Sequence, residues 1–95
     1  MAGPSKGNAK IGTSSALIVA ANTGRNGVIL TNEGDDDVWL GFGEAAVENE
    51  GMKVPAGGSA VCHYGGRPDR YDDIFEQAVY GIASGAGNVV AYQEI

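Results

Sequence analysis

Residues 25–43, RNGVILTNEGDDDVWLGFG, place two runs of strand-forming residues on either side of a short polar segment. The runs span residues 28–31 and 38–42, and their β-branched and aromatic side chains favour a pleated, half-buried surface. Residues 32–37 between them are of the kinds that bend a chain, and they include neither a nucleophile nor a histidine. These features predict a β-hairpin that serves as scaffold and not as an active-site loop.

Other short runs of strand character recur along the chain and are separated by turns that contain glycine. They cover residues 16–21, 59–64, 74–75, 78–83 and 89–92. No long stretch has the apolar period of a helix, and the sixteen glycines suit tight turns between short strands. The pattern predicts an all-β domain over residues 16–95, a small antiparallel β-sandwich or jelly-roll-like barrel of roughly six to eight strands.

Residues 1–15 differ from the rest of the chain because they are small and polar. After Met1 they contain one large apolar side chain, Ile11. A segment of this composition does not bury enough apolar surface to fold by itself. We therefore expect residues 1–15 to form a flexible N-terminal arm.

Charge is distributed unevenly along the chain. All twelve acidic residues lie at or after Glu33, so the first 32 residues carry only Lys6, Lys10 and Arg25 and have a charge of +3. The remainder sets three basic residues against the twelve acids, which is −9, and this excess disfavours nucleic-acid binding. We expect the arm to contact an acidic partner surface through Lys6, Lys10 and Ile11, although three charges are also compatible with a solvated tail.

A chain of 95 residues forms one domain and buries only about 60–65% of the surface that its unfolded form exposes. Its only cysteine, Cys62, has no partner for an internal disulfide, so oligomerisation is the expected source of additional stability. The start of the chain lacks the apolar core of a signal peptide, and no apolar run reaches the ~20 residues of a membrane span. We expect synthesis in the cytoplasm and no membrane partner.

Residues 33–37 are the best metal candidate by composition, because calcium takes several carboxylate ligands. Calcium loops space their ligands at alternate positions, however, so three consecutive aspartates favour a solvated turn. Cys62 and His63 are neighbours in a predicted strand and point to opposite faces, which excludes a thiolate with its base and leaves their role open. No catalytic, cofactor-binding or metal-ligating residue is predicted, and we do not expect an enzyme.

The aromatic side chains that could form a sugar-binding platform are Trp39, Tyr64, Tyr71, Tyr80 and Tyr92. Three of them lie within predicted strands, and Trp39 in particular is expected to be buried in the core or at a subunit contact. The charged segment 67–73 is predicted to be a surface loop. Within it, Arg67, Arg70 and Tyr71 are possible exposed contact residues.

The segments GRNGVILTNEG, VWLGFG, VPAGGS and AVYGIASGAGNVVAYQE follow one another and cover most of residues 16–94. In this order the chain resembles small structural proteins of tailed bacteriophages, the head decoration or cement proteins and related head-fibre domains. The resemblance implies a β-sandwich that assembles as a homotrimer on the capsid exterior, contacts the major capsid protein and stabilises the shell. The alternative is a head-fibre or tail-associated module that recognises a host-surface glycan. No cofactor is expected for either role.

Overall fold

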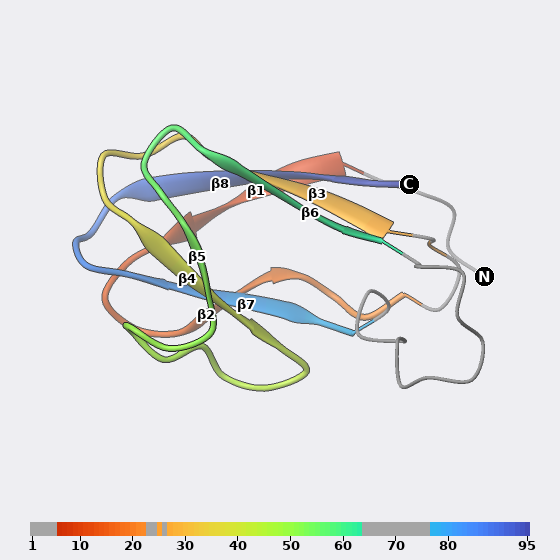
Figure 1. Cartoon of the computed structure of the whole chain (residues 1–95), viewed down its shortest axis with the longest axis horizontal. Helices are drawn as coiled ribbons and strands as arrows, with labels where there is room; N and C mark the ends of the chain where they lie inside the picture. Colours follow the sequence, from red (N-terminus) through yellow and green to blue (C-terminus); the bar gives the residue numbers. More distant parts are fainter. Residues whose placement is uncertain (1–5, 23–24, 26, 64–76) are drawn as a thin grey trace.

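The computed structural model describes residues 6–22, 25, 27–63 and 77–95. These residues form two four-stranded antiparallel sheets that pack face to face, with sheet A above sheet B in Figure 1. The strands are β1 (Lys6–Ile11), β2 (Ala16–Val19), β3 (Gly27–Asn32), β4 (Val38–Phe42), β5 (Met52–Val54), β6 (Ser59–His63), β7 (Val79–Ala83) and β8 (Asn88–Glu94). The predicted all-β sandwich is therefore confirmed.

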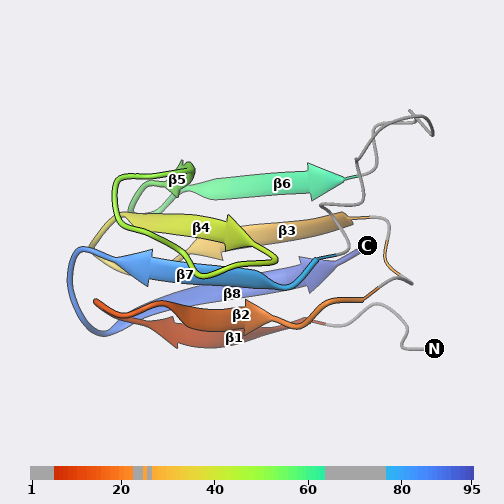
Figure 2. The ribbon, with the colours of Figure 1, turned by 90° about the horizontal axis from the view of Figure 1, so that it is seen from below.

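The order of the strands identifies the type of sandwich. Sheet A has the order β1-β8-β3-β6 and sheet B the order β2-β7-β4-β5. Four antiparallel pairs connect strands from the two halves of the chain: β1–β8, β2–β7, β3–β6 and β4–β5. Along the sequence each pair lies inside the one before it, as in one long antiparallel hairpin that folds over to form two sheets. Figure 2 shows the corresponding strands of the two sheets lying over each other. This is the topology of an eight-stranded jelly roll.

The predicted hairpin between residues 28–31 and 38–42 is wrong, although both runs are strands. β3 belongs to sheet A and β4 to sheet B, so residues 33–37 carry the chain from one sheet to the other. The Asn32 side chain holds this crossing in place: its amide group donates to the carbonyl oxygens of Asp36 at 2.7 Å and of Val54 at 3.0 Å. A short polar connection suits a hairpin and a crossing equally well, which is why the local pattern is ambiguous.

The prediction of a flexible arm over residues 1–15 is wrong for residues 6–11, which form β1. This strand pairs with β8 along its whole length, from Lys6 opposite Gln93 to Ile11 opposite Asn88. Ile11 is only 1% exposed and belongs to the hydrophobic core. It is therefore not available for the predicted contact with a partner surface.

The polar composition of β1 reflects the positions of its residues in an edge strand. Lys6, Asn8 and Lys10 point to the outer face and are exposed, whereas Gly7 and Ala9 point inward. Gly7 is required by packing, because a Cβ at this position would lie 2.9 Å from the hydroxyl oxygen of Tyr92. Alternation of lysine and small residues thus produces a strand that lacks the usual apolar signature.

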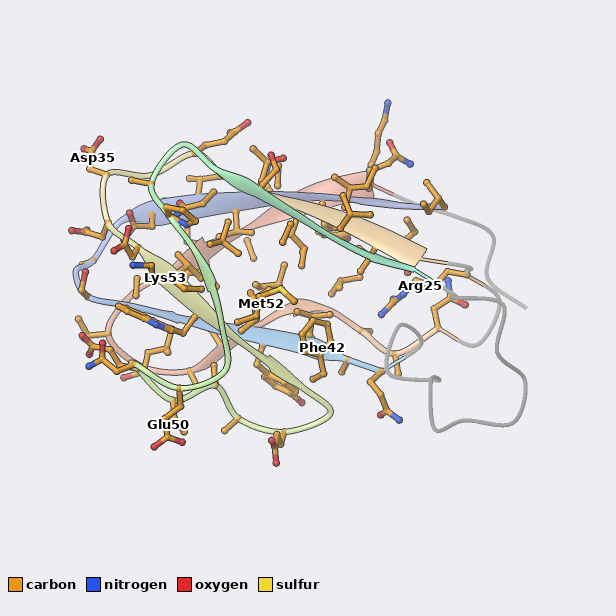
Figure 3. All side chains as sticks on the ribbon, in the orientation of Figure 1. Arg25, Asp35, Phe42, Glu50, Met52 and Lys53 are labelled. Atoms are coloured by element: carbon orange, nitrogen blue, oxygen red, sulfur yellow. The ribbon has the colours of Figure 1, made fainter. Side chains whose placement is uncertain are left out.

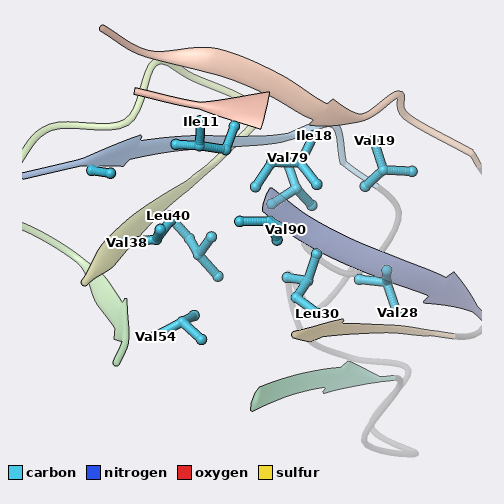
Figure 4. Close-up of a cluster of buried hydrophobic side chains, with 11 residues drawn as sticks. Ile11, Ile18, Val19, Val28, Leu30, Val38, Leu40, Val54, Val79 and Val90 are labelled. Carbon is cyan, nitrogen blue, oxygen red and sulfur yellow. The ribbon is translucent and has the colours of Figure 1, made fainter. Parts of the chain in front are cut away.

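The core lies between the sheets and is built from the inward-facing residues of the strands (Figure 4). Its buried members are Ile11, Ile18, Val19, Val28, Leu30, Val38, Leu40, Val54, Val79, Ala83 and Val90. Trp39 is buried as predicted, with 9% of its surface exposed, but it alternates with Val38 and Leu40 and so faces outward from sheet B. The segment after β4 folds back over this outer face, since a Cβ on Gly41 would lie 2.6 Å from the carbonyl oxygen of Glu44.

Candidate functional site

The outer face of sheet A presents two rows of side chains that each cross all four strands. We define the sheet A face as these two rows together with Lys10 and Val89, which are paired at one end of β1 and β8. The first row is Asn8, Ala91, Thr31 and Ser59, and the second is Lys6, Gln93, Ile29 and Val61. All ten residues are exposed or half-buried. The regular register makes this a continuous surface to which each strand contributes.

The ten residues of the sheet A face include two lysines and no acid, but the exposed Glu33 follows directly at the end of β3, where its backbone N–H donates to the carbonyl oxygen of Val89. Lys6 and Lys10 are exposed on β1. The other described acidic residues lie within residues 35–37, within residues 44–50, and at Glu94, which is buried. Figure 3 shows Glu50 beneath sheet B, on the opposite side of the sandwich from sheet A. Lys6 and Lys10 therefore lie along one margin of the sheet A face and Glu33 at the end of β3, so the β1 margin is the part of the face that suits binding to an acidic surface.

The remaining residues of the sheet A face are small, neutral or β-branched. Thr31 Oγ1 and Ser59 Oγ lie 3.3 Å apart and form a hydrogen bond between β3 and β6. Ala91 and Ile29 occupy the middle of the two rows on β8 and β3. Such a face can contact a flat partner through van der Waals packing and hydrogen bonds, with Lys6 and Lys10 adding charge at one margin.

Arg25, the third basic residue of the leading part, belongs to the interior and not to the surface. Its side chain is 0% exposed and that of Glu94 is 3% exposed, with 2.7 Å between Arg25 Nη1 and Glu94 Oε2. The guanidinium also donates to the carbonyl oxygens of Ala20 and Gln77. The ion pair and these hydrogen bonds join the segment after β2, Gln77 in the segment before β7, and the end of β8. Arg25 and Glu94 are 69 positions apart, so no local pattern in the sequence could reveal the ion pair.

Two aspartates of residues 33–37, Asp36 and Asp37, stabilise the local structure. Asn88, which is 1% exposed, accepts from the Asp36 backbone N–H at 3.0 Å and donates to the Asp36 carboxylate at 3.1 Å. Asp37 accepts from the backbone N–H of Ala56 at 3.2 Å and lies 3.6 Å from Lys53 Nζ. Within the described part of the chain, no group of three or more potential metal ligands is found.

Asn88→Ala should lower the free energy of unfolding by about 1–3 kcal/mol, because it leaves the part-buried groups of Asp36 and Gly85 without their amide partner. Urea denaturation followed by circular dichroism measures this change. Asn8→Ala is the matched control, since Asn8 is exposed on β1 and its replacement should change stability by no more than about 0.5 kcal/mol. Equal effects of the two substitutions would contradict the structural role of Asn88.

The other predicted contact residues divide into three groups. Lys6 and Lys10 lie on the sheet A face, whereas Ile11 is in the core. Arg67, Arg70 and Tyr71 fall outside the described residues. Sequence reasoning did not identify Val61 or its neighbours as a surface, because the two rows depend on pairings between distant strands.

No described aromatic side chain is fully exposed. Trp39 is buried, and Phe42, Tyr80 and Tyr92 are half-buried, with Phe42 and Tyr92 packed against the core. Tyr64 and Tyr71 lie outside the described residues. The described part of the chain therefore offers no ready platform on which a sugar ring could stack.

Comparison with known proteins leaves the fold as the basis for classification. No protein-family model, curated protein or solved structure matches the chain. Among the residues described here there is no helix of the length and apolarity needed to cross a membrane. The described residues form a small jelly-roll β-sandwich with Lys6 and Lys10 exposed on one face.

Proposed function

We propose that this chain is a capsid decoration, or cement, protein that binds the exterior of a phage head as an oligomer and stabilises the shell. The observation that carries the proposal is the sheet A face: it is a regular surface that spans four strands and has Lys6 and Lys10 along one edge. Jelly rolls form viral capsid domains and also lectin domains, so the fold alone does not decide between the two roles. The character of the face favours the structural role.

The proposed partner is the major capsid protein, contacted through an acidic or neutral part of its outer surface. The sheet A face turns its lysines toward the shell, while the acidic residues of 33–37 lie at the C-terminal end of β3 and those of 44–50 in the segment after β4. This orientation brings Lys6 and Lys10 to the contact, where they complement an acidic partner surface. The role requires no catalytic residue, because binding that stabilises a shell depends on the contact area and on the complementarity of the two surfaces.

A host-glycan binding module is the competing role, and the described residues support it less well. Carbohydrate sites commonly use an aromatic ring as an exposed apolar platform. The described rings are buried or half-buried, and Trp39 is covered on the outer side of sheet B. We therefore favour decoration of the capsid over recognition of a glycan.

Purified virions provide the direct test of the proposed location. Mass spectrometry of the particles should detect the chain, and electron cryomicroscopy of the heads should show density of its size and shape on the outer surface. Absence of the chain from purified heads, or its presence only at the tail tip, would overturn the proposed function.

Lys10→Glu should weaken binding to capsids that lack the protein, and Lys6→Glu combined with Lys10→Glu should weaken it by about tenfold. The reason is that both side chains face the proposed partner in an exposed, salt-screened setting. Lys53→Glu is the matched control, because it changes the net charge by the same amount as Lys10→Glu but lies on β5 of sheet B beside Asp37. Occupancy is measured by co-sedimentation at low and raised salt. Equal occupancy by Lys10→Glu and wild type at both salt concentrations would refute the assigned orientation.

A further inference from the structure

Three of the four edge strands carry features that oppose pairing with another chain. β1 presents Lys6 and Lys10. β2 has a register shift between Leu17 and Val19, as in a β-bulge. β5 is only three residues long, contains Lys53 and is followed by Pro55. Charged side chains, bulges, short length and proline are the usual protections of sheet edges.

β6, the fourth edge strand, carries none of these protections. Its sequence SAVCH contains no lysine, acid, proline or glycine. It pairs with β3 at five consecutive positions without a register shift, so it is regular along its length. Val61, at its centre, is 53% exposed, more than any other large apolar side chain described.

The outer backbone groups of β6 are directed away from sheet A. Asn32 exchanges backbone hydrogen bonds with residues 57–58, so its N–H and C=O point toward the β6 side of β3. The N–H and C=O groups of successive residues point to opposite sides of a strand. The backbone hydrogen bonds between β3 and β6 are therefore made by Ala60 and Cys62 of β6. The N–H and C=O groups of Ser59, Val61 and His63 then point outward, where no described strand pairs with them.

We propose that two copies of this chain pair antiparallel through β6, with Val61 of one copy opposite Val61 of the other. In this register each outward N–H of one β6 meets an outward C=O of the other, and Ser59 lies opposite His63. The two Val61 side chains come together on the outer face and extend the row that each forms with Ile29. The outer edge of β6 is self-complementary, so β6 of a second copy can form hydrogen bonds with all of its outward N–H and C=O groups.

Charge favours the antiparallel arrangement over a parallel one. The acidic segment 33–37 lies at the Ser59 end of β6, because Asn32 is bonded to Gly58 and Asp37 to Ala56. In an antiparallel pair the two acidic segments lie at opposite ends of the interface. The strand itself contains no acid, lysine or arginine, so the pairing brings no like-charged side chains of β6 opposite each other.

The pairing would join the two A sheets into one continuous sheet. The two-fold axis between antiparallel strands is perpendicular to the sheet, so both sheet A faces would lie on the same side, with Lys6 and Lys10 at the two far margins. This step rests on the proposed function: the paired protein presents twice the surface of one copy to the capsid. The pairing itself is argued from the edge strand and does not depend on that function.

A trimer would require a different contact. A ring of three copies needs β6 of each copy to pair with another edge of the next, and β1, β2 and β5 are the edges available in the described structure. Each of them carries one of the protective features above. The edge chemistry therefore favours two-fold pairing over the three-fold assembly that the family resemblance implies.

Sedimentation equilibrium of the full chain tests this proposal. The wild type should have twice the 9.7 kDa mass of one chain, and Val61→Lys should have the mass of one chain at the same concentration. Val47→Lys is the matched control, because Val47 is 49% exposed but lies in the segment after β4, and this variant should keep the wild-type mass. Circular dichroism establishes that the variants are folded.

Hydrogen exchange of the wild type provides a second measurement that does not depend on a variant. The amide protons of Ser59 and Val61 should exchange more slowly as protein concentration rises. A wild-type mass of one or three chains, an unchanged mass for Val61→Lys, or exchange rates that do not vary with concentration would overturn the pairing. A single-chain protein that still occupies capsids would refute the pairing alone, and a paired protein that is absent from virions would refute the proposed function alone.

Discussion

Deletion of residues 2–12 should leave the chain unfolded, because it removes the whole of β1. The loss strips six residue pairs from the edge of β8 and takes Ile11 out of the core. Truncation of a buried isoleucine alone lowers stability by about 2–5 kcal/mol. A domain has only about 5–15 kcal/mol in total, so the loss of the strand as well should exceed what this small sandwich can tolerate.

Far-UV circular dichroism and thermal denaturation of the truncated protein measure this effect. Deletion of residues 2–5 is the matched control, because it leaves all of β1 in place and should preserve the cooperative transition. Ile11→Ala should lower the free energy of unfolding by about 2–5 kcal/mol, whereas Lys10→Ala, at an exposed position, should change it by no more than about 0.5 kcal/mol. A truncated protein with the wild-type melting temperature would restore the interpretation of residues 1–15 as a passive arm.

Arg25→Met should lower the free energy of unfolding by about 3–5 kcal/mol, because it leaves the Glu94 carboxylate buried without its guanidinium partner. Arg25 also satisfies the carbonyl oxygens of Ala20 and Gln77, so its loss loosens the end of the sandwich where three segments meet. Urea denaturation at neutral pH measures the change. Lys53→Met is a control for an exposed ion pair, and its effect should stay below about 1 kcal/mol.

The double variant Arg25→Met with Glu94→Leu separates the ion pair from the packing of its members. Replacing both charged groups by apolar ones removes the unpaired charge, so the double variant should recover most of the stability lost by Arg25→Met. A double-mutant cycle then reports the coupling between the two positions. Additive effects of the two single substitutions would show that Arg25 and Glu94 stabilise the fold independently of each other.

Local patterns in the sequence were sufficient to predict most of the strands. Residues 16–21, 59–64 and 89–92 contain β2, β6 and most of β8, because alternating or continuous apolar residues are a property of the segment itself. The burial of Trp39 followed from its position between two strand-forming residues. The all-β class and the absence of helices among the described residues were predictable for the same reason.

The assignment of strands to sheets could not be predicted in this way. β3 and β4 are separated by five residues, which is compatible with a hairpin in one sheet or with a crossing between two. The crossing between sheets depends on hydrogen bonds between segments that are distant in the sequence. Asn32 donates to the carbonyl oxygen of Val54, and Asn88 accepts from the backbone N–H of Asp36. β1 was missed because its exposed lysines and inward-facing small residues form a strand only when β8 is beside it.

The candidate site was predictable only in its charged members. Lys6 and Lys10 attract attention by their position in an acid-free stretch, and the structure places both on one face. Arg25 shares that stretch but is buried, since burial depends on Glu94 at the other end of the chain. The unprotected edge at Val61 becomes visible only when the four edge strands are compared in space.

The pairing of β1 with β8 also determines when folding can be completed. Lys6 lies opposite Gln93, so β1 has no partner in sheet A until the ribosome has synthesised β8. Contacts between such distant segments slow folding, and an apolar strand left unpaired during that interval would be prone to aggregate. The sequence KGNAKI of β1 has two lysines and a glycine and a low tendency to form intermolecular sheets. The polar composition of β1, which resembles that of a disordered tail, thus suits a strand that stays unpaired until β8 has been synthesised.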